Sequence, residues 1–122
     1  MNRLTAVVIV IILMTVGVFV AERDLSSSTD KLEADITACE ELFNNRQYED
    51  CTTKITQTQK QWESRYDRLS LFVDNEKLDE MSTLLATMRV AARKRVTADF
   101  LISAESVKIL IEQLSKEFEF RI

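Results

Sequence analysis

Residues 4–21 read LTAVVIVIILMTVGVFVA, a run of eighteen residues without a charged side chain. As an α-helix this run would be roughly 27 Å long, close to the thickness of the hydrocarbon core of a bilayer. The rival interpretation is a cleaved signal peptide, whose apolar core is usually about 7–15 residues long and is followed by small residues before the cut. Cleavage after Ala21 would leave Phe19 at the third position before the cut. We therefore expect an uncleaved transmembrane helix at residues 4–21, within an anchor segment of residues 1–24.

Few charged residues flank this segment. Arg3 and the α-amino group precede it, whereas Glu22, Arg23 and Asp24 follow it without a net positive excess. Because cytoplasmic flanks of membrane spans are enriched in Lys and Arg, this distribution favours a cytoplasmic N-terminus and an extracytoplasmic helical domain in a single-pass protein of the cell membrane. A homo-oligomer is an alternative, but the lone Gly17 provides no small-residue dimerisation motif to support one.

The remainder of the chain has the composition of a helical protein. It contains no Pro, no His and no Gly after Gly17. Tight β-hairpins and phosphate-binding loops depend on glycine, so both are disfavoured. The formal net charge is −4 and the two signs are interspersed, which argues against binding to nucleic acid. We therefore expect an all-α domain at residues 25–122 that does not bind nucleic acid.

Four amphipathic segments follow the apolar run. Asp30 and Glu33, placed after the polar residues 26–29, resemble a capping box and predict that the first of these helices begins near residue 29. The helices are predicted at residues 29–44, 46–72, 75–95 and 97–119. Their apolar stripes are Leu32, Ile36, Cys39 and Phe43; Tyr48, Cys51, Ile55, Trp62 and Leu69; Leu78, Met81, Leu85, Met88 and Ala92; and Phe100, Ala104, Val107, Ile111, Leu114 and Phe118. Short connections imply antiparallel neighbours, so we predict an N-terminal transmembrane helix followed by a four-helix bundle of two helical hairpins.

Cys39 and Cys51 each lie six residues from Asn45, so antiparallel helices that turn there would bring the two cysteines level. A disulfide closing this short loop would contribute about 3 kcal/mol in the chain-entropy model and would require a compartment outside the reducing cytosol. The alternative is a pair of buried thiols that act as small apolar residues. Helix register cannot be read from sequence with the accuracy that a disulfide requires, so both alternatives stay open.

No set of residues predicts catalysis or metal binding. Two thiols without histidine cannot by themselves complete a structural zinc site. The acidic turn of Asp74, Glu76, Asp79 and Glu80 lacks the glycine and the alternating ligands of a calcium loop, and helix capping explains it better. Without histidine these carboxylates also lack the usual partner for acid–base or nucleophilic chemistry. We therefore expect no enzymatic activity, no metal and no cofactor.

An aromatic stretch closes the second predicted helix. Trp62 and Leu69 belong to the inward stripe, which leaves Tyr66 and Phe72 as candidates for contact with a partner protein. The alternative is that both of these rings pack into the core.

Residues 62–81, WESRYDRLSLFVDNEKLDEM, resemble the most recognisable segment of the bacterial family known as domain of unknown function 4363. The positions that match the family's pattern are Tyr48, Trp62, Leu69, Phe72, Asp74, Leu78, Asp79 and Glu80. Arg68 stands where the family often has a second Trp, and Asn75 where it often has His, so no role that needs an imidazole at this turn applies. The resemblance implies a source among the Firmicutes, an N-terminal anchor and a multi-pass membrane partner.

Two functional hypotheses follow. The first is a membrane-anchored accessory or scaffold protein that acts through protein–protein contacts, with a membrane protein as its expected partner. The second is an extracytoplasmic module that binds a peptide or another ligand, because paired helices of this length resemble part of a helical-repeat array. A persistent groove on the surface would favour the second hypothesis.

Overall fold

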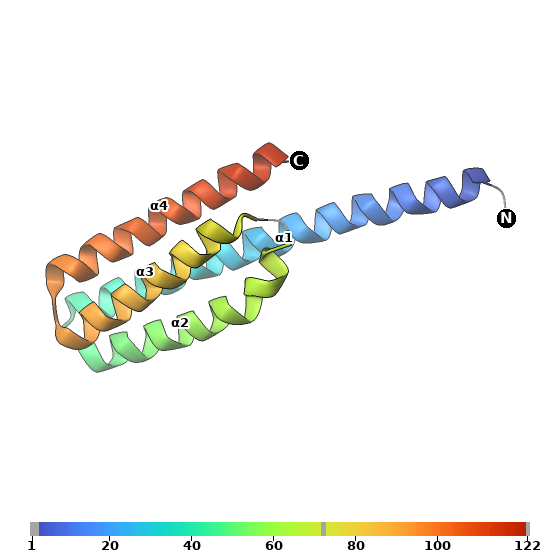
Figure 1. The fold of residues 1–122 in the computed structure, drawn as a ribbon. Coiled ribbons are helices and arrows are strands. Elements are labelled where there is room, and N and C mark those ends of the chain that lie inside the picture. Colours follow the sequence, from blue (N-terminus) through green and yellow to red (C-terminus); the bar gives the residue numbers. More distant parts are fainter. Residues whose placement is uncertain (1–2, 72, 122) are drawn as a thin grey trace.

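The computed structural model describes residues 3–71 and 73–121, except for the side chains of residues 17–26 and 117–121. These residues form four α-helices and no strand: α1 (Arg3–Asn44), α2 (Tyr48–Leu69), α3 (Asn75–Lys94) and α4 (Thr97–Arg121). The helices run up and down beside one another, and the first half of α1 extends beyond the other three (Figure 1). The all-α class predicted from the sequence is confirmed.

The helix α1 is continuous for 42 residues, which corrects the prediction of a separate helix beginning near residue 29. That prediction relied on Ser and Thr, which favour helix starts and turns when exposed. In the structure Ser28 and Thr29 are only 2% and 3% exposed, because they lie on the face of α1 that packs into the bundle. Asp30 and Glu33 are exposed residues in mid-helix and not a cap. With no proline and no further glycine in this stretch, nothing in the backbone ends the helix.

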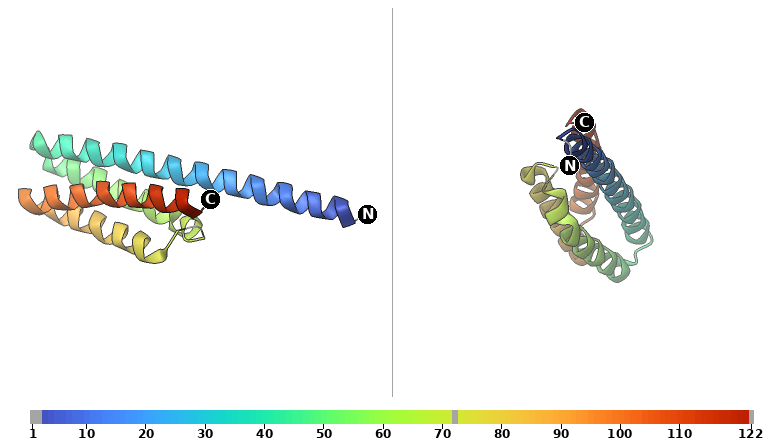
Figure 2. Two further views of the ribbon diagram at one scale, coloured as in Figure 1. Left: turned by 90° about the horizontal axis from the view of Figure 1, so that it is seen from above. Right: turned by 90° about the vertical axis from the view of Figure 1, so that its right-hand side faces the viewer.

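The other three helices begin and end within three residues of the predicted bounds. Each helix of the bundle packs against two others: α1 and α3 both contact α2 and α4 (Figure 2). The buried apolar side chains are Leu32, Ile36, Cys39, Phe43, Cys51, Ile55, Trp62, Leu69, Val73, Leu78, Met81, Leu85, Met88, Ala91, Ala92, Phe100, Ala104, Val107, Leu110, Ile111 and Leu114. They include the predicted stripes apart from Tyr48, which is only partly buried, and Phe118, whose side chain lies outside the described residues.

Two arginines reverse the chain where glycine is usual. Arg46 and Arg95 have φ angles of 61° and 59°, in the left-handed region. At the end of α1, the backbone N–H groups of Arg46 and Gln47 donate to the carbonyl oxygens of Phe43 and Leu42 at 3.0 and 2.9 Å. The same pair of bonds closes the end of α3. This is the Schellman motif, so two backbone hydrogen bonds hold each arginine in a conformation that costs it free energy.

Aromatic rings connect these two turns. Phe43 stacks on Phe100 with ring centroids 4.0 Å apart, and Tyr48 packs edge-on against Phe43 at 5.1 Å. The Arg95 guanidinium lies 4.9 Å from the centroid of the Tyr48 ring, within the range of a cation–π contact. Arg95, in the turn after α3, therefore stabilises the start of α2, the helix that follows the turn at Arg46.

Two ion pairs connect α1 to its neighbours. Lys54 of α2 lies 3.3 Å from a carboxylate oxygen of Asp35, and Lys108 of α4 lies 2.5 Å from one of Glu40. The hydrogen bond to Glu40 raises the pKa of Lys108. Both pairs are partly exposed, so each contributes about 1 kcal/mol or less to stability. They nonetheless favour one rotation of α1 over others, because both acidic residues must face their lysines.

We predict that Arg46→Gly stabilises the protein by about 1 kcal/mol, since glycine adopts the left-handed conformation without a clash at Cβ. Arg46→Ala is the matched control, because it also removes the guanidinium but keeps Cβ. Urea unfolding followed by circular dichroism in detergent would measure both free energies of unfolding. A glycine variant no more stable than the alanine variant would contradict the argument from backbone strain.

Candidate functional site

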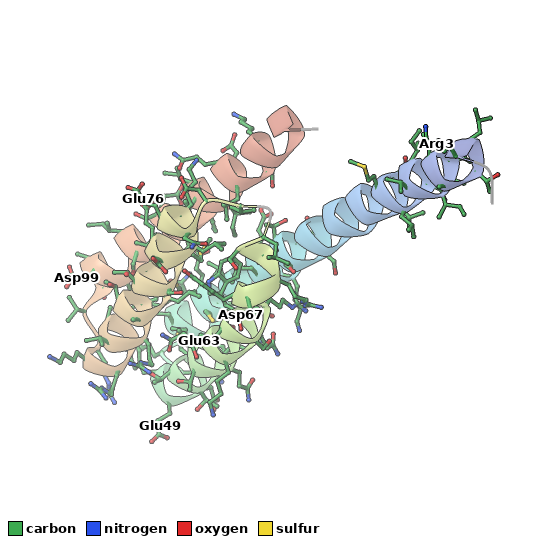
Figure 3. All side chains as sticks on the ribbon, turned by 45° about the vertical axis from the view of Figure 1, so that its right-hand side comes forward. Arg3, Glu49, Glu63, Asp67, Glu76 and Asp99 are labelled. Atoms are coloured by element: carbon green, nitrogen blue, oxygen red, sulfur yellow. The ribbon has the colours of Figure 1, made fainter. Side chains whose placement is uncertain are left out.

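The N-terminal part of α1 presents apolar side chains on every side. Ten large apolar residues are between 43% and 75% exposed: Leu4, Val7, Val8, Ile9, Val10, Ile11, Ile12, Leu13, Met14 and Val16. Successive residues of a helix point about 100° apart, so the unbroken run from Val7 to Met14 covers the whole circumference. Figure 3 shows these side chains projecting around the helix beyond the bundle. A helix that is apolar all round needs an apolar environment, from lipid or from another protein.

Where side chains are described, no helix is both long enough and apolar enough to cross a bilayer. The predicted span at residues 4–21 runs past Val16 into residues 17–26, whose side chains lie outside that part of the structure.

The bundle itself has a charged exterior. Glu49, Glu63, Asp67, Glu76 and Asp99 all point outward from it (Figure 3). Its surface therefore differs sharply from that of the N-terminal segment.

The connection between α2 and α3 lies at the end of the bundle from which the apolar segment emerges (Figures 1 and 2). Of the two predicted contact residues, Tyr66 is half-buried, and its hydroxyl donates to Asp79 at 2.5 Å. This hydrogen bond to a carboxylate raises the pKa of the Tyr66 phenol. The other, Phe72, lies outside the described residues. Beside it Leu71 is 77% exposed, a candidate contact that we did not predict because the sequence pattern gave it no role.

Most of the remaining residues of the family pattern contribute to the core or to a helix cap. Trp62, Leu69 and Leu78 are buried in the core, and Tyr48 packs against it. Asp74 caps α3 by accepting a hydrogen bond from the backbone N–H of Glu76 at 3.1 Å. Glu80 is exposed. Within the described residues no group of three or more acidic, Cys or His residues is placed to hold a metal ion.

The two cysteines are brought together as the sequence spacing suggested. Both are free thiols and fully buried, and the Cys51 thiol donates to the backbone carbonyl of Cys39 at 3.3 Å. Burial raises the pKa of Cys39 to about 12, with a smaller contribution from neighbouring Cys51, and raises that of Cys51 to about 11. Of the two alternatives left open by the sequence, the structure presents the buried thiols.

We predict that Cys39 and Cys51 react slowly with iodoacetamide at pH 8, because only the thiolate is nucleophilic and both pKa values are far above this pH. In a Gln57→Cys variant the added thiol, at an exposed position on α2, should react first and act as an internal control. Denaturant should expose all three thiols. The same shifts should lower stability as the pH rises above 9.0, the ordinary thiol value, because the unfolded chain then loses protons that the folded chain retains. Native thiols that react as fast as the control would contradict their burial.

Comparison with known proteins identifies a family. Residues 19–122 match the model of the family described as Domain of unknown function (DUF4363), and this range includes the whole bundle. Neither the curated proteins nor the solved structures gave a match. The chain therefore belongs to the DUF4363 family, whose name records a domain of unknown function.

Proposed function

We propose that this protein is a membrane-anchored accessory or scaffold protein. In this proposal residues 4–21 insert into the cell membrane with the N-terminus in the cytoplasm, and the bundle lies on the extracytoplasmic side. The bundle acts by contact with a multi-pass membrane protein and catalyses no reaction of its own.

The observation that carries the proposal is the exposure of apolar side chains around the whole circumference of α1 before the bundle. Burying this surface in lipid removes it from water at a gain of about 25 cal/mol per Å². Moving the charged exterior of the bundle out of water would bring no such gain. A boundary between the two environments near residues 17–26 agrees with the charges at Glu22, Arg23 and Asp24.

The direction of α1 supports a specific contact surface. Because α1 leaves the bundle beside the α2–α3 connection, that end of the bundle would face the membrane (Figure 1). A partner embedded in the bilayer would meet the bundle at that end. At this end Leu71 is exposed and Tyr66 is only partly buried, so both offer apolar surface.

A second candidate function is binding of a peptide or another ligand. A groove of about 410 Å³ runs along α3 and the start of α4, with Thr83, Val90, Lys94, Val96 and Asp99 among its walls. This volume lies within the usual range of about 300–1,000 Å³ for ligand pockets. The groove is open and far from the apolar segment, so we rank this function second.

We predict that the full-length protein sediments with membranes and resists extraction by alkaline carbonate. Replacing Val8 and Ile12 by Arg should release it, because each Arg at the centre of a span costs about 2.5–3.5 kcal/mol. Both side chains are exposed, so the bundle should remain folded. The control replaces exposed Thr53 and Gln57 of α2 by Arg and should remain in the membrane fraction. Release of the unmodified protein by carbonate would contradict the anchor.

We further predict that affinity purification in mild detergent, at the native expression level, recovers one abundant multi-pass membrane protein. Leu71→Ser should reduce this recovery several-fold, because it removes apolar surface at the end of the bundle near the membrane. Leu101→Ser, which alters an exposed leucine near the start of α4, is the matched control and should have no effect. Recovery of the protein alone would favour the ligand-binding function, and equal loss with both variants would contradict the proposed contact surface.

A further inference from the structure

A small cavity with polar and apolar walls lies between α1 and α2, near the level at which α1 leaves the bundle. Its volume is about 10 Å³, and its walls include Ser28 and Asp35 from α1 and Thr58 and Trp62 from α2. This is about the smallest space that admits one water molecule. Ser28 and Trp62 are equally distant in sequence from Asn45, so the antiparallel pairing that brings the cysteines level also sets these two side chains opposite each other.

Two of the residues that line this cavity each carry a buried polar atom without a hydrogen-bond partner among the described residues. The hydroxyl oxygen of Ser28 and the indole nitrogen of Trp62 are both buried, and neither has a hydrogen-bond partner among the described residues. The two side chains belong to residues that are only 2% and 3% exposed, so bulk water does not reach them freely. A buried indole N–H is a donor that costs free energy when it is left unpaired. An occupant of the adjoining cavity that accepts a hydrogen bond would remove this cost.

We propose that this cavity binds one structural water molecule that bridges α1 and α2. The water accepts a hydrogen bond from the indole N–H of Trp62 and donates one to the hydroxyl oxygen of Ser28. Its second proton faces Asp35, which is also a residue of the cavity wall. A serine oxygen and a carboxylate both accept hydrogen bonds, so the water has the two to four polar partners that ordered internal waters usually have.

Other occupants fit the cavity less well. An apolar group would leave both polar atoms unpaired. Polyatomic anions exceed the volume, and a cation cannot accept a hydrogen bond from the indole. The walls also include Lys31 and Arg65, whose positive charges disfavour a cation. The water is independent of any membrane anchoring, because its site lies wholly within the bundle.

The chain contains a single tryptophan, so its ultraviolet resonance Raman spectrum reports on Trp62 alone. The indole bands shift when the N–H group donates a hydrogen bond. We expect the full-length protein in detergent to show the band position of a hydrogen-bonded indole. The position of a free indole N–H would overturn the proposal.

A crystal structure of the same chain identifies the hydrogen-bond acceptor. We expect electron density for one water within hydrogen-bond distance of both Ser28 Oγ and Trp62 Nε1. A direct bond between these two atoms, or a protein carbonyl as the acceptor, would overturn the proposal even if the Raman band shows a bonded indole.

Ser28→Val tests the site in solution, because its methyl groups fill the cavity without accepting a hydrogen bond. We expect the Raman band to move to the free position and the midpoint of urea unfolding to fall. Ser27→Val is the matched control, since it makes the same change at an exposed neighbouring position on α1. A Ser28→Val variant that keeps the bonded indole band would contradict the bridge, and if it does not fold, the two measurements on the unmodified protein still decide.

Discussion

The reversal of the chain at Arg46 is the constraint on which the rest of the bundle depends. It fixes the level at which α1 meets α2, and residues equally distant from Asn45 then face each other. Cys39 meets Cys51 in this register, and Ser28 meets Trp62. A shift by one residue would turn the apolar stripe of α2 by about 100° and expose much of it. A single backbone conformation therefore determines the contents of the interface between these two helices.

Much of this fold follows from the sequence because apolar residues recur at helical spacing in all four segments. Leu85 and Val107, for example, are both fully buried as the pattern predicts. The break expected at residues 26–29 failed for a tertiary reason: Ser28 is buried in the bundle, and local preference cannot foresee that burial. Arg46 and Arg95 carry no local signal for a left-handed conformation. Only the lack of glycine indicated that some other residue must adopt one.

The candidate sites differ in how much of their structure could be predicted from the sequence. The spacing of Cys39 and Cys51 was enough to predict that they lie close together, because they are on the apolar stripes of two helices joined by one short turn. The exposure of Leu71 and the unpaired indole of Trp62 depend on how α2 sits against its neighbours, and no pattern of residue types encodes that. The stretch around Trp62 was nevertheless sufficient to indicate the family, which the match over residues 19–122 now shows.

The continuity of α1 has a geometric consequence. One helix runs from the apolar segment into the bundle without a break. The orientation of the apolar segment therefore fixes the orientation of the bundle. Each residue added between the two parts would turn the bundle by about 100° and move it by about 1.5 Å along the axis. The number of residues between Val16 and Ser28 therefore sets the direction, around the axis of α1, in which each surface of the bundle faces relative to the surroundings of the apolar segment.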